Sequence, residues 1–264
     1  MLVLNKVSKI FSPGTVNEHY ALYGLSLTLA DGEFITVIGE NGAGKSTLLN
    51  IVSGVFPCDA GKITLDGADI TALKEFKRSR LIGRVFQDPL KGTAFDMTIA
   101  ENLSIAYGKN KPHGLGAGLS KKDDKFFRDK LELLGLGLEN RMNHKVGLLS
   151  GGQRQALTLL MATIVKPKLL LLDEHTAALD PGAADTITRL TEQIVAEQGI
   201  ATLMVTHNMK QALKSGSRTI MMSEGQIVLD VSGEERASLT VEDLVARFAA
   251  KKGKALIDDR LLLG

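Results

Sequence analysis

A glycine-rich segment between two apolar runs constrains the fold of this chain more than any other part of it. Residues 39–46 read GENGAGKS and fit the pattern G-x-x-x-x-G-K-[ST]. The apolar run 34–38 precedes them and the helical pattern of residues 47–52 follows, so the segment is expected to turn a buried strand into a helix. At such a turn, glycines let backbone N–H groups point into one concavity, where the helix presents the positive end of its dipole. The pattern predicts a P-loop (residues 39–46) that binds the phosphates of a nucleotide.

Individual positions of the P-loop have separate expected tasks. Lys45 can reach the β and γ phosphates, and we count it among the catalytic residues, while the hydroxyl of Ser46 can coordinate Mg²⁺. The alternative is a glycine turn that arises by chance. The residues expected to hold the nucleotide here are Gly39, Asn41, Gly42, Ala43, Gly44, Lys45, Ser46 and Thr47.

An acidic pair follows a run of four leucines. Residues 169–172 predict a strand buried on both faces, with Asp173 and Glu174 at its carboxyl end. Ligands of open α/β sheets bind at that end, and adjacent side chains of a strand point in opposite directions. We therefore assign Asp173 to Mg²⁺, through water, and Glu174 to the role of general base or water-orienting group. A helix-capping acidic pair is the alternative.

A second anion-binding signal lies at residues 149–153, which read LSGGQ and form what we call the signature segment. It opens an apolar helical run, 154–165, and small residues at a helix start leave N–H groups open to an anion. Alone, this would be an ordinary helix cap. Between a P-loop and an acidic strand end, however, the sequence closely resembles the ATP-binding subunits of ABC transporters, whose signature motif is LSGGQ. The resemblance spans about residues 1–230.

This resemblance implies a site shared between two copies of the chain. In the family, the signature of one subunit closes over the γ-phosphate that the P-loop of another subunit holds, which gives a head-to-tail dimer with two ATP molecules at its interface. Ser150, Gly151 and Gly152 are accordingly expected to act across the interface, with Gln153 also at the nucleotide. Hydrolysis would then depend on dimer closure, because the groups that stabilise phosphoryl charge are missing from an open site.

Three further polar positions match the family in order along the chain. Gln87 corresponds to the Q-loop glutamine, which contacts Mg²⁺ or the attacking water and joins the nucleotide site to the helical part. Asp180 corresponds to the D-loop, and His207 to the switch histidine that contacts the γ-phosphate. Taken singly, Gln87 is a polar strand-end residue, Asp180 a helix cap and His207 a loop residue; their order after the P-loop favours the functional assignments.

An aromatic ring is expected against the adenine. Phe11 occupies the position where the family places this ring, and phenylalanine in place of the frequent tyrosine keeps the π face but lacks the hydroxyl. Tyr20 is the rival for this contact, and packing in the core is the alternative for either ring.

Short apolar runs predict an α/β fold with a mainly parallel sheet, at residues 34–38, 81–86, 169–172 and 201–205. Residues 181–198 predict a helix that Asp180 caps and Gly199 ends, and residues 218–223 and 226–231 predict two strands joined by a tight turn. With the resemblance, the expected architecture is a RecA-like P-loop NTPase core with an N-terminal antiparallel β subdomain and an inserted α-helical signature subdomain. The predicted divisions are an ABC ATPase domain at 1–230, of which 1–87 and 159–230 form the core and 88–158 the helical insertion, and a tail at 231–264 with a short helix at 241–249.

Composition narrows the class of partner. The formal net charge is +2 over 264 residues, which gives no reason to expect a nucleic-acid partner. The lone cysteine fits a reducing compartment. The most apolar stretch, 156–165, is well short of the roughly 20 residues that cross a bilayer. We therefore expect a peripheral position on the cytoplasmic face of the membrane, held through a partner.

The functional expectation is an Mg-ATP-hydrolysing subunit that drives a separately encoded membrane permease. The sequence around the motifs, notably at residues 13–18 and 173–180, resembles a bacterial uptake subgroup that works with extracytoplasmic solute-binding proteins. Aromatic amino acids are a candidate solute. The alternatives are an exporter or lipid-extracting ABC ATPase, which would share every catalytic residue, and a soluble ABC ATPase unconnected with transport. A P-loop kinase or nucleotide switch is disfavoured by the signature segment.

Two departures from the family pattern need interpretation. His175 stands where the family commonly has proline after the catalytic glutamate, and we take it to mark a subgroup. A metal-binding role is disfavoured because no second His or Cys lies nearby in sequence. The glycine-rich, basic stretch 108–118 is either a plain surface loop or a segment that alters contact with the membrane partner.

Overall fold

The computed structural model describes residues 1–109 and 121–252, and within them the strands form two sheets. The larger sheet has the order β10-β9-β3-β8-β7-β6. Its strands are β3 (Phe34–Gly39), β6 (Ile82–Val85), β7 (Leu169–Asp173), β8 (Ala201–Val205), β9 (Arg218–Ser223) and β10 (Gln226–Ser232). Neighbours pair in parallel except β9 and β10, which form an antiparallel hairpin. The central strands are buried along most of their length, as their uninterrupted apolar runs predict.

The smaller sheet is antiparallel and has the order β2-β1-β4-β5. Its strands are β1 (Leu2–Phe11), β2 (His19–Leu29), β4 (Ala60–Leu65) and β5 (Ala68–Asp69). Alternate residues of β2 are buried at Leu25, Leu27 and Leu29 and exposed between them. One face of this sheet therefore covers the core, and the other faces solvent.

Helix α1 (Lys45–Ser53) joins the two sheets into one core. Its side chains Leu48, Leu49 and Ile51 are fully buried in the same apolar cluster as residues of both sheets, such as Leu4 and Leu203. The helix that follows the P-loop is thus held on two sides, which fixes the position of its N-terminus.

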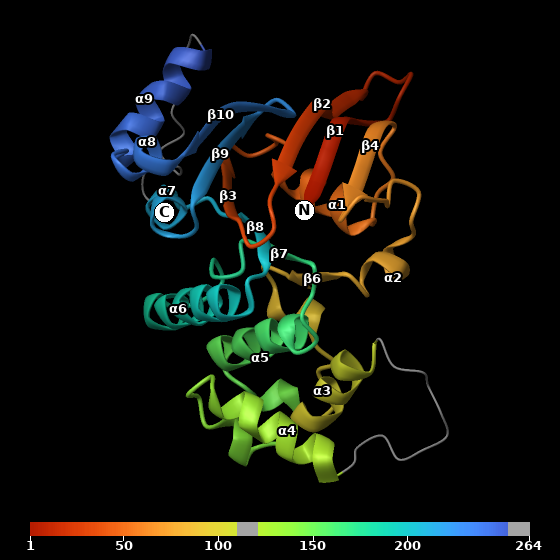
Figure 1. Ribbon diagram of the computed structural model, residues 1–264, viewed down its shortest axis with the longest axis vertical. Coiled ribbons are helices and arrows are strands. Elements are labelled where there is room, and N and C mark those ends of the chain that lie inside the picture. The colour runs from red at the N-terminus through yellow and green to blue at the C-terminus, as the bar shows by residue number, and fades with distance from the viewer. Residues whose placement is uncertain (110–120, 253–264) are drawn as a thin grey trace.

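The helical region lies at the end of the molecule opposite α9 (Figure 1). Its α-helices are α3 (Ile99–Gly108), α4 (Lys121–Glu132) and α5 (Gly151–Thr163). Short 3-10 helices lie before α3, at Pro89–Gly92, and between α4 and α5, at Leu138–Asn140 and Val146–Leu148. They share a core with α6 (Pro181–Gln198) and the sheet. Because α5 continues unbroken through residue 158, one helix connects the helical region to the core.

The remaining helices are α2 (Glu75–Arg78), α7 (Met209–Lys214), α8 (Gly233–Ala237) and α9 (Val241–Lys252). Leu244 and Phe248 of α9 pack against Met209 of α7 and Met221 of β9. In the described part of the chain, no helix is long and apolar enough to cross a membrane.

The predicted fold class is confirmed, with local corrections. Helix α5 starts at Gly151, earlier than the predicted residue 154, because Ser150 caps it. Helix α9 ends at Lys252, later than the predicted residue 249. Most of the glycine-rich stretch 108–118 lies outside the described residues, as does the end of the tail from residue 253.

A buried arginine closes the C-terminal end of α1. Arg78 is only 2% exposed, and its guanidinium donates hydrogen bonds to the carbonyls of Ile51 (2.7 Å) and Val52 (2.9 Å) in the last turn of α1. It also donates to the carbonyls of Leu73 (2.7 Å) and Thr71 (2.9 Å). A cation at this end of a helix is favoured by the helix dipole, and burial lowers the pKa of the guanidinium without removing its charge at ordinary pH.

Replacing this side chain tests how far it stabilises the P-loop helix. Arg78→Met should lower the free energy of unfolding by about 2–4 kcal/mol, because several buried carbonyls lose their donors. Lys77→Met, on the exposed part of the same short helix, should change it by less than about 0.5 kcal/mol. Denaturant unfolding followed by circular dichroism measures the stability of both variants. Equal free energies of unfolding for the two would show that the hydrogen bonds of Arg78 do not stabilise α1.

Candidate active site

The P-loop depends on glycine at two points where the chain passes close to other backbone. Gly39 has φ 150°, and a Cβ on it would lie 2.3 Å from the carbonyl oxygen of Met222. Gly44 has φ 97°, and a Cβ there would lie 2.4 Å from the carbonyl oxygen of Ala21. Only glycine fits at either position, so the backbone of the loop is set by its surroundings.

The N-terminus of α1 is open to an anion. Among the described residues, no side chain caps this helix, and its first turn contains no acidic residue. By contrast, Ser150 caps α5 and Asp180 caps α6. The N–H groups and the positive dipole end of α1 are therefore left to a group outside the helix, and a phosphate fits both requirements.

Lys45 lies across the P-loop. Its Nζ atom donates to the carbonyl oxygens of Gly39 (2.7 Å) and Glu40 (2.9 Å), and the residue is 7% exposed. Burial lowers the pKa of the ammonium, while the carboxylates of Glu174, Glu40 and Asp173 oppose that shift. The charge of Lys45 is thus held at the point where the loop receives phosphates.

The cavity of the P-loop has an aromatic wall. Phe11 and His19, which pair across β1 and β2, line it together with residues 41–47 and Glu174. The ring of Phe11 packs edge-to-face on Phe56, with ring centroids 5.5 Å apart. Tyr20, the rival for the adenine contact, is 43% exposed and packs on Tyr23 instead. The geometry favours Phe11, and it adds His19, which sequence reasoning missed because only the strand register places it there.

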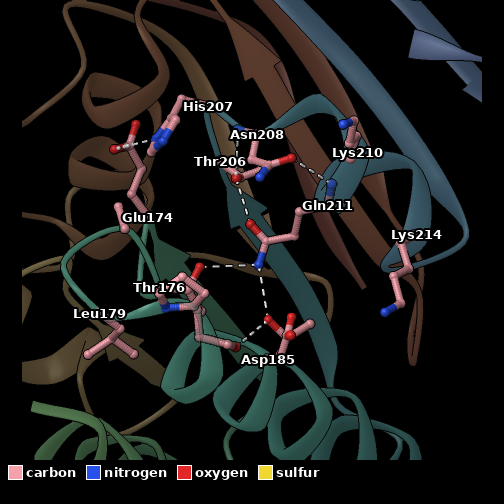
Figure 2. Close-up of a pocket in the computed structure, with 14 residues that line it drawn as sticks. Glu174, Thr176, Leu179, Asp185, Thr206, His207, Asn208, Lys210, Gln211 and Lys214 are labelled. Carbon is pink, nitrogen blue, oxygen red and sulfur yellow. Dashed lines mark hydrogen bonds and ion pairs between the residues drawn. The ribbon is translucent and has the colours of Figure 1, made fainter. Parts of the chain in front are cut away.

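Glu174 has an unusual backbone conformation just after β7. Its φ is +45°, and its N–H donates to the carbonyl of Val205 on the neighbouring strand β8 (2.9 Å). Its Oε2 lies 3.2 Å from Nδ1 of His207, and Figure 2 shows the two side chains directed toward each other. A non-glycine residue at positive φ costs on the order of 1–3 kcal/mol and persists only where the surroundings enforce it. The strained conformation lowers stability, and in it the side chain of Glu174 lines the P-loop cavity and contacts His207.

Asp173 forms an ion pair that no sequence pattern predicted. Arg84 of the adjacent strand β6 donates from Nη2 to Oδ2 of Asp173 (3.0 Å) and from Nη1 to Oγ of Ser53 (3.1 Å). Its guanidinium also stacks over the ring of Phe86, 4.7 Å from the centroid. Arginine therefore holds one oxygen of the carboxylate that we assigned to Mg²⁺.

The predicted magnesium ligands supply the type of donor that the ion prefers. Ser46 offers a hydroxyl, Gln87 an amide oxygen and Asp173 a carboxylate, all oxygen donors. Ser46 and Gln87 are exposed. Within residues 1–109 and 121–252, His, Cys, Asp and Glu side chains do not gather in groups of three or more that could hold a metal. The three oxygen donors suit Mg²⁺, which usually takes further ligands from phosphates and water.

The signature segment lies against the start of α6. The Oγ atom of Ser150 accepts from the N–H of Gln153 (3.3 Å), whose side chain accepts from the N–H of Ser150 (3.2 Å). A Cβ on Gly152 would lie 2.9 Å from Cβ of Ala183, so glycine allows the two helix starts to approach. In the described chain, none of residues 150–153 lines the P-loop cavity of the same molecule.

The other two predicted positions, Asp180 and Gln87, lie between the strands β7 and β6 and the helical segments that follow these strands. Asp180 accepts a hydrogen bond from the N–H of Ala183 (3.0 Å), so it serves as the cap of α6 that the sequence predicted. Gln87 follows β6 and is exposed, two residues before the short turn Pro89–Gly92.

A second cavity, of about 460 Å³, lies between Glu174, His207 and the starts of α6 and α7. Gln211 spans it: its Oε1 accepts from the hydroxyl of Thr206 (2.8 Å), and its Nε2 donates to the hydroxyls of Thr176 and Thr188 (3.2 Å each) (Figure 2). These bonds connect the segment before His207 with the segment after Glu174. Sequence reasoning missed Gln211, because no local pattern marks it.

Comparisons with known proteins agree on one family. The model of the family described as ABC transporter matches residues 22–177. A tyrosine transport ATP-binding protein of Clostridioides difficile is 48% identical over 249 residues, which cover 94% of this chain and 98% of that protein. A lipoprotein-releasing system ATP-binding protein of a Ruegeria species is 33% identical and covers 86% of this chain and 97% of that protein.

A solved structure has a fold similar to that of this chain. It is a dimeric post-hydrolysis state of an ATP-binding cassette bound to ADP and Pi, 29% identical to this chain with a TM-score of 0.74. It covers 88% of this chain and 98% of the solved chain.

His175, the departure from the family pattern, is a buried residue of the core. It is 2% exposed, and its Nε2 lies 3.1 Å from Oγ1 of Thr191. Because the Thr191 hydroxyl donates to the carbonyl of Ile187 (2.8 Å), Nε2 of the ring carries the proton in this contact. Burial lowers the pKa of His175 to about 4.

This buried ring should make the protein sensitive to acid. The unfolded chain binds a proton at His175 below about pH 6.5 and the folded chain only below about pH 4, so stability is complete above pH 6.5 and falls through this window. The expected loss from this group is about 3 kcal/mol. His175→Leu should lose less stability between pH 7 and pH 4, as measured by denaturant unfolding at several pH values. A ring that titrates near pH 6.5 by NMR in the folded protein would contradict this expectation.

Proposed function

Because the chain belongs to the ABC transporter family, in which it is an ATP-hydrolysing subunit, we propose that it drives the import of an amino acid through a separate membrane permease. The observation that carries this proposal is the 48% identity with a tyrosine transport ATP-binding protein along almost the full length of both chains. We further propose that an extracytoplasmic solute-binding protein delivers the solute, and that the chain lies on the cytoplasmic face of the membrane.

Export is the alternative, and specific relatives favour it. Proteins of lipoprotein-releasing systems are 33–36% identical to this chain. Relatives at similar identity are named for import, of thiamine (32%), spermidine and putrescine (31%) and methionine (36%), and these support import as the first choice.

We propose that the P-loop binds the phosphates of ATP through residues 39–47, with Phe11 stacked on the adenine. The support is the uncapped N-terminus of α1, the two obligatory glycines, and the position of Phe11 in the same cavity. Ser46, Gln87 and Asp173 would hold Mg²⁺, which offsets the negative charge of the phosphates. Lys45 would move from the loop carbonyls to the phosphate oxygens.

Glu174 is proposed as the general base of hydrolysis. Water attacks the γ-phosphorus, its proton passes to the carboxylate of Glu174, and the bond from the γ-phosphorus to the bridging oxygen of the β-phosphate breaks. His207 would keep the carboxylate oriented through its 3.2 Å contact, and we propose that it also contacts the γ-phosphate. The backbone bond from Glu174 to Val205 fixes the direction of the side chain.

The site is proposed to be completed by a second copy. Cassettes of this family dimerise, and a solved relative with ADP and Pi is a dimer. Because residues 150–153 do not line the P-loop cavity of their own molecule in the described chain, we assign Ser150, Gly151, Gly152 and Gln153 to the nucleotide of the partner copy, with Asp180 at the same interface.

We also propose the division of the chain into an ABC ATPase domain at residues 1–230 and a tail at 231–264. Within the domain, the core is formed by 1–87 and 159–230 and the helical region by 88–158.

Replacing the base tests the hydrolytic assignment. Glu174→Gln should retain ATP, lower the turnover rate by about 10²–10³-fold and trap a closed dimer that elutes early in size-exclusion chromatography. Lys45→Ala serves as the control that weakens nucleotide binding itself, so it should show no ATP-dependent dimer. Undiminished turnover in Glu174→Gln would remove Glu174 from its role.

The permease is proposed to dock on an exposed apolar patch of the helical region, formed by Phe95 and Leu148. These side chains are 49% and 77% exposed, and the N–H of Gly147 bonds to the carbonyl of Phe95, which brings the two segments together. Large apolar side chains exposed side by side are typical of contact surfaces.

Uptake and copurification test the proposed function together. In cells that lack the chain, the wild-type protein should restore uptake of labelled tyrosine and copurify with a multispan permease. Leu148→Glu should keep ATP binding but lose the permease, because a buried carboxylate would lack a partner. Leu133→Glu, equally apolar and 61% exposed, lies outside the patch and should behave as wild type. Recovery with a soluble cytosolic partner instead would overturn the transport proposal.

A further inference from the structure

Gln155 is a buried amide that contacts both catalytic strand ends. It lies on α5 and is fully buried. Its Nε2 donates to the carbonyl oxygen of Phe86 (3.1 Å) and to that of His175 (2.7 Å). Phe86 directly precedes Gln87, and His175 directly follows Glu174. One NH₂ group thus uses both of its protons on the backbone beside the two residues proposed to handle water and Mg²⁺.

The two carbonyls belong to segments that leave neighbouring parallel strands. Val85 of β6 and Leu172 of β7 are paired in register just before them. The pairing between β6 and β7 ends at these residues, whereas β7 still pairs with β8 at Asp173 and the N–H of Glu174 bonds to the carbonyl of Val205. The amide of Gln155 therefore links the segments that follow β6 and β7 where the pairing between these two strands has ended.

The same residue belongs to the helix that begins at the signature segment. Ser150 caps α5, and Gln155 lies little more than one turn into the helix. A helix moves as a rigid element, so a displacement at Ser150 and Gly151 reaches the carbonyls of Phe86 and His175 through Gln155.

Gln155 has an energetic cost that packing alone does not explain. Its Oε1 is buried and finds no hydrogen-bond partner in the described structure. An unsatisfied buried acceptor costs about 1–3 kcal/mol, which an apolar side chain of similar length would avoid. The conformation of Glu174, at φ +45°, also needs support on both sides, and Gln155 holds the residue after it while Val205 holds its own N–H.

We propose that Gln155 is a positioning residue that couples the signature end of α5 to Gln87 and Glu174. When α5 shifts as the signature segment meets the nucleotide of the partner copy, the amide carries the shift to both strand ends and brings Glu174 into position to take the proton of the attacking water. The inference rests on the proposed roles of Glu174 and Gln87.

The test compares two substitutions on α5. Gln155→Met keeps the length and packing of the side chain but removes both donors, so kcat should fall about 10–100-fold while the dissociation constant of a fluorescent ATP analogue changes less than about twofold. Thr163→Val is the control, because this buried hydroxyl donates only within its own helix, to the carbonyl of Leu159 (2.8 Å). It should leave kcat unchanged.

A double variant separates positioning from general loss of structure. If Gln155 acts through Glu174, adding Gln155→Met to Glu174→Gln should lower the residual rate by less than about twofold, whereas independent effects would multiply. Unchanged kcat in Gln155→Met, or multiplied losses in the double variant, would overturn the inference. Undiminished turnover in Glu174→Gln would instead overturn the proposed role of Glu174.

A second variant applies if Gln155→Met does not fold. In Gln155→Glu the protonated carboxyl supplies one O–H donor and the ionised form supplies none, and burial favours the protonated form. The ratio of variant to wild-type kcat should therefore rise as pH falls. A ratio that stays constant with pH, in a folded variant, would contradict the positioning role.

Discussion

The uncapped N-terminus of α1 is the constraint on which the rest of the site depends. A helix start buried without a cap leaves N–H groups that need a partner, and here neither a side chain cap nor a first-turn carboxylate is present in the described residues. Residues of both sheets pack with α1 in one apolar cluster, and Arg78 donates to carbonyls at the far end of the helix. The helix is therefore fixed in place before any ligand arrives, and its anion site needs little reorganisation to accept phosphate.

Around this helix, the groups proposed for catalysis lie at strand ends, where residues distant in sequence hold them. Glu174 is directed by Val205 and His207, and Asp173 by Arg84. These contacts join segments far apart in sequence across one edge of the parallel sheet. A carboxylate that is held in place loses less entropy when it acts, which is one way in which an enzyme lowers a barrier. Glu174 keeps a strained backbone conformation, with positive φ, and this strain is consistent with a residue whose side-chain direction is needed for function.

Local patterns predicted much of the fold, because their signals lie within a few residues of one another. The bounds of α6 follow from Asp180 at one end and Gly199 at the other, and β8 matches its apolar run of residues 201–205. The register of β1 with β2 could not be derived in this way, since it depends on pairing across a sheet.

The candidate site divides along the same line between local and distant contacts. Lys45 and Asp180 were found because motif and cap patterns are local. Arg84, Gln155 and Gln211 were missed because each bonds to atoms far away in sequence, at 89, 69 and 35 residues in the contacts concerned. Every residue has a backbone carbonyl, so a side chain that bonds to one does not require a particular residue type as its partner. For this reason no residue pattern at Phe86 or His175 points to Gln155.

The roles proposed for the chain are consistent with a family whose members are named for different transported molecules. The family match at residues 22–177 includes the P-loop, the signature segment and the acidic strand end, and the relatives include proteins named for tyrosine transport, thiamine import and lipoprotein release. The steps proposed for the P-loop and Glu174, phosphate binding and proton transfer, do not involve the transported solute. What can differ is the surface that meets another protein, and on this chain exposed apolar side chains such as Leu148 lie in the helical region that also carries Gln155. A partner that pushes on this region would act on α5, and through the amide of Gln155 on both catalytic strand ends, so binding of the permease and cleavage of ATP would share one mechanical element.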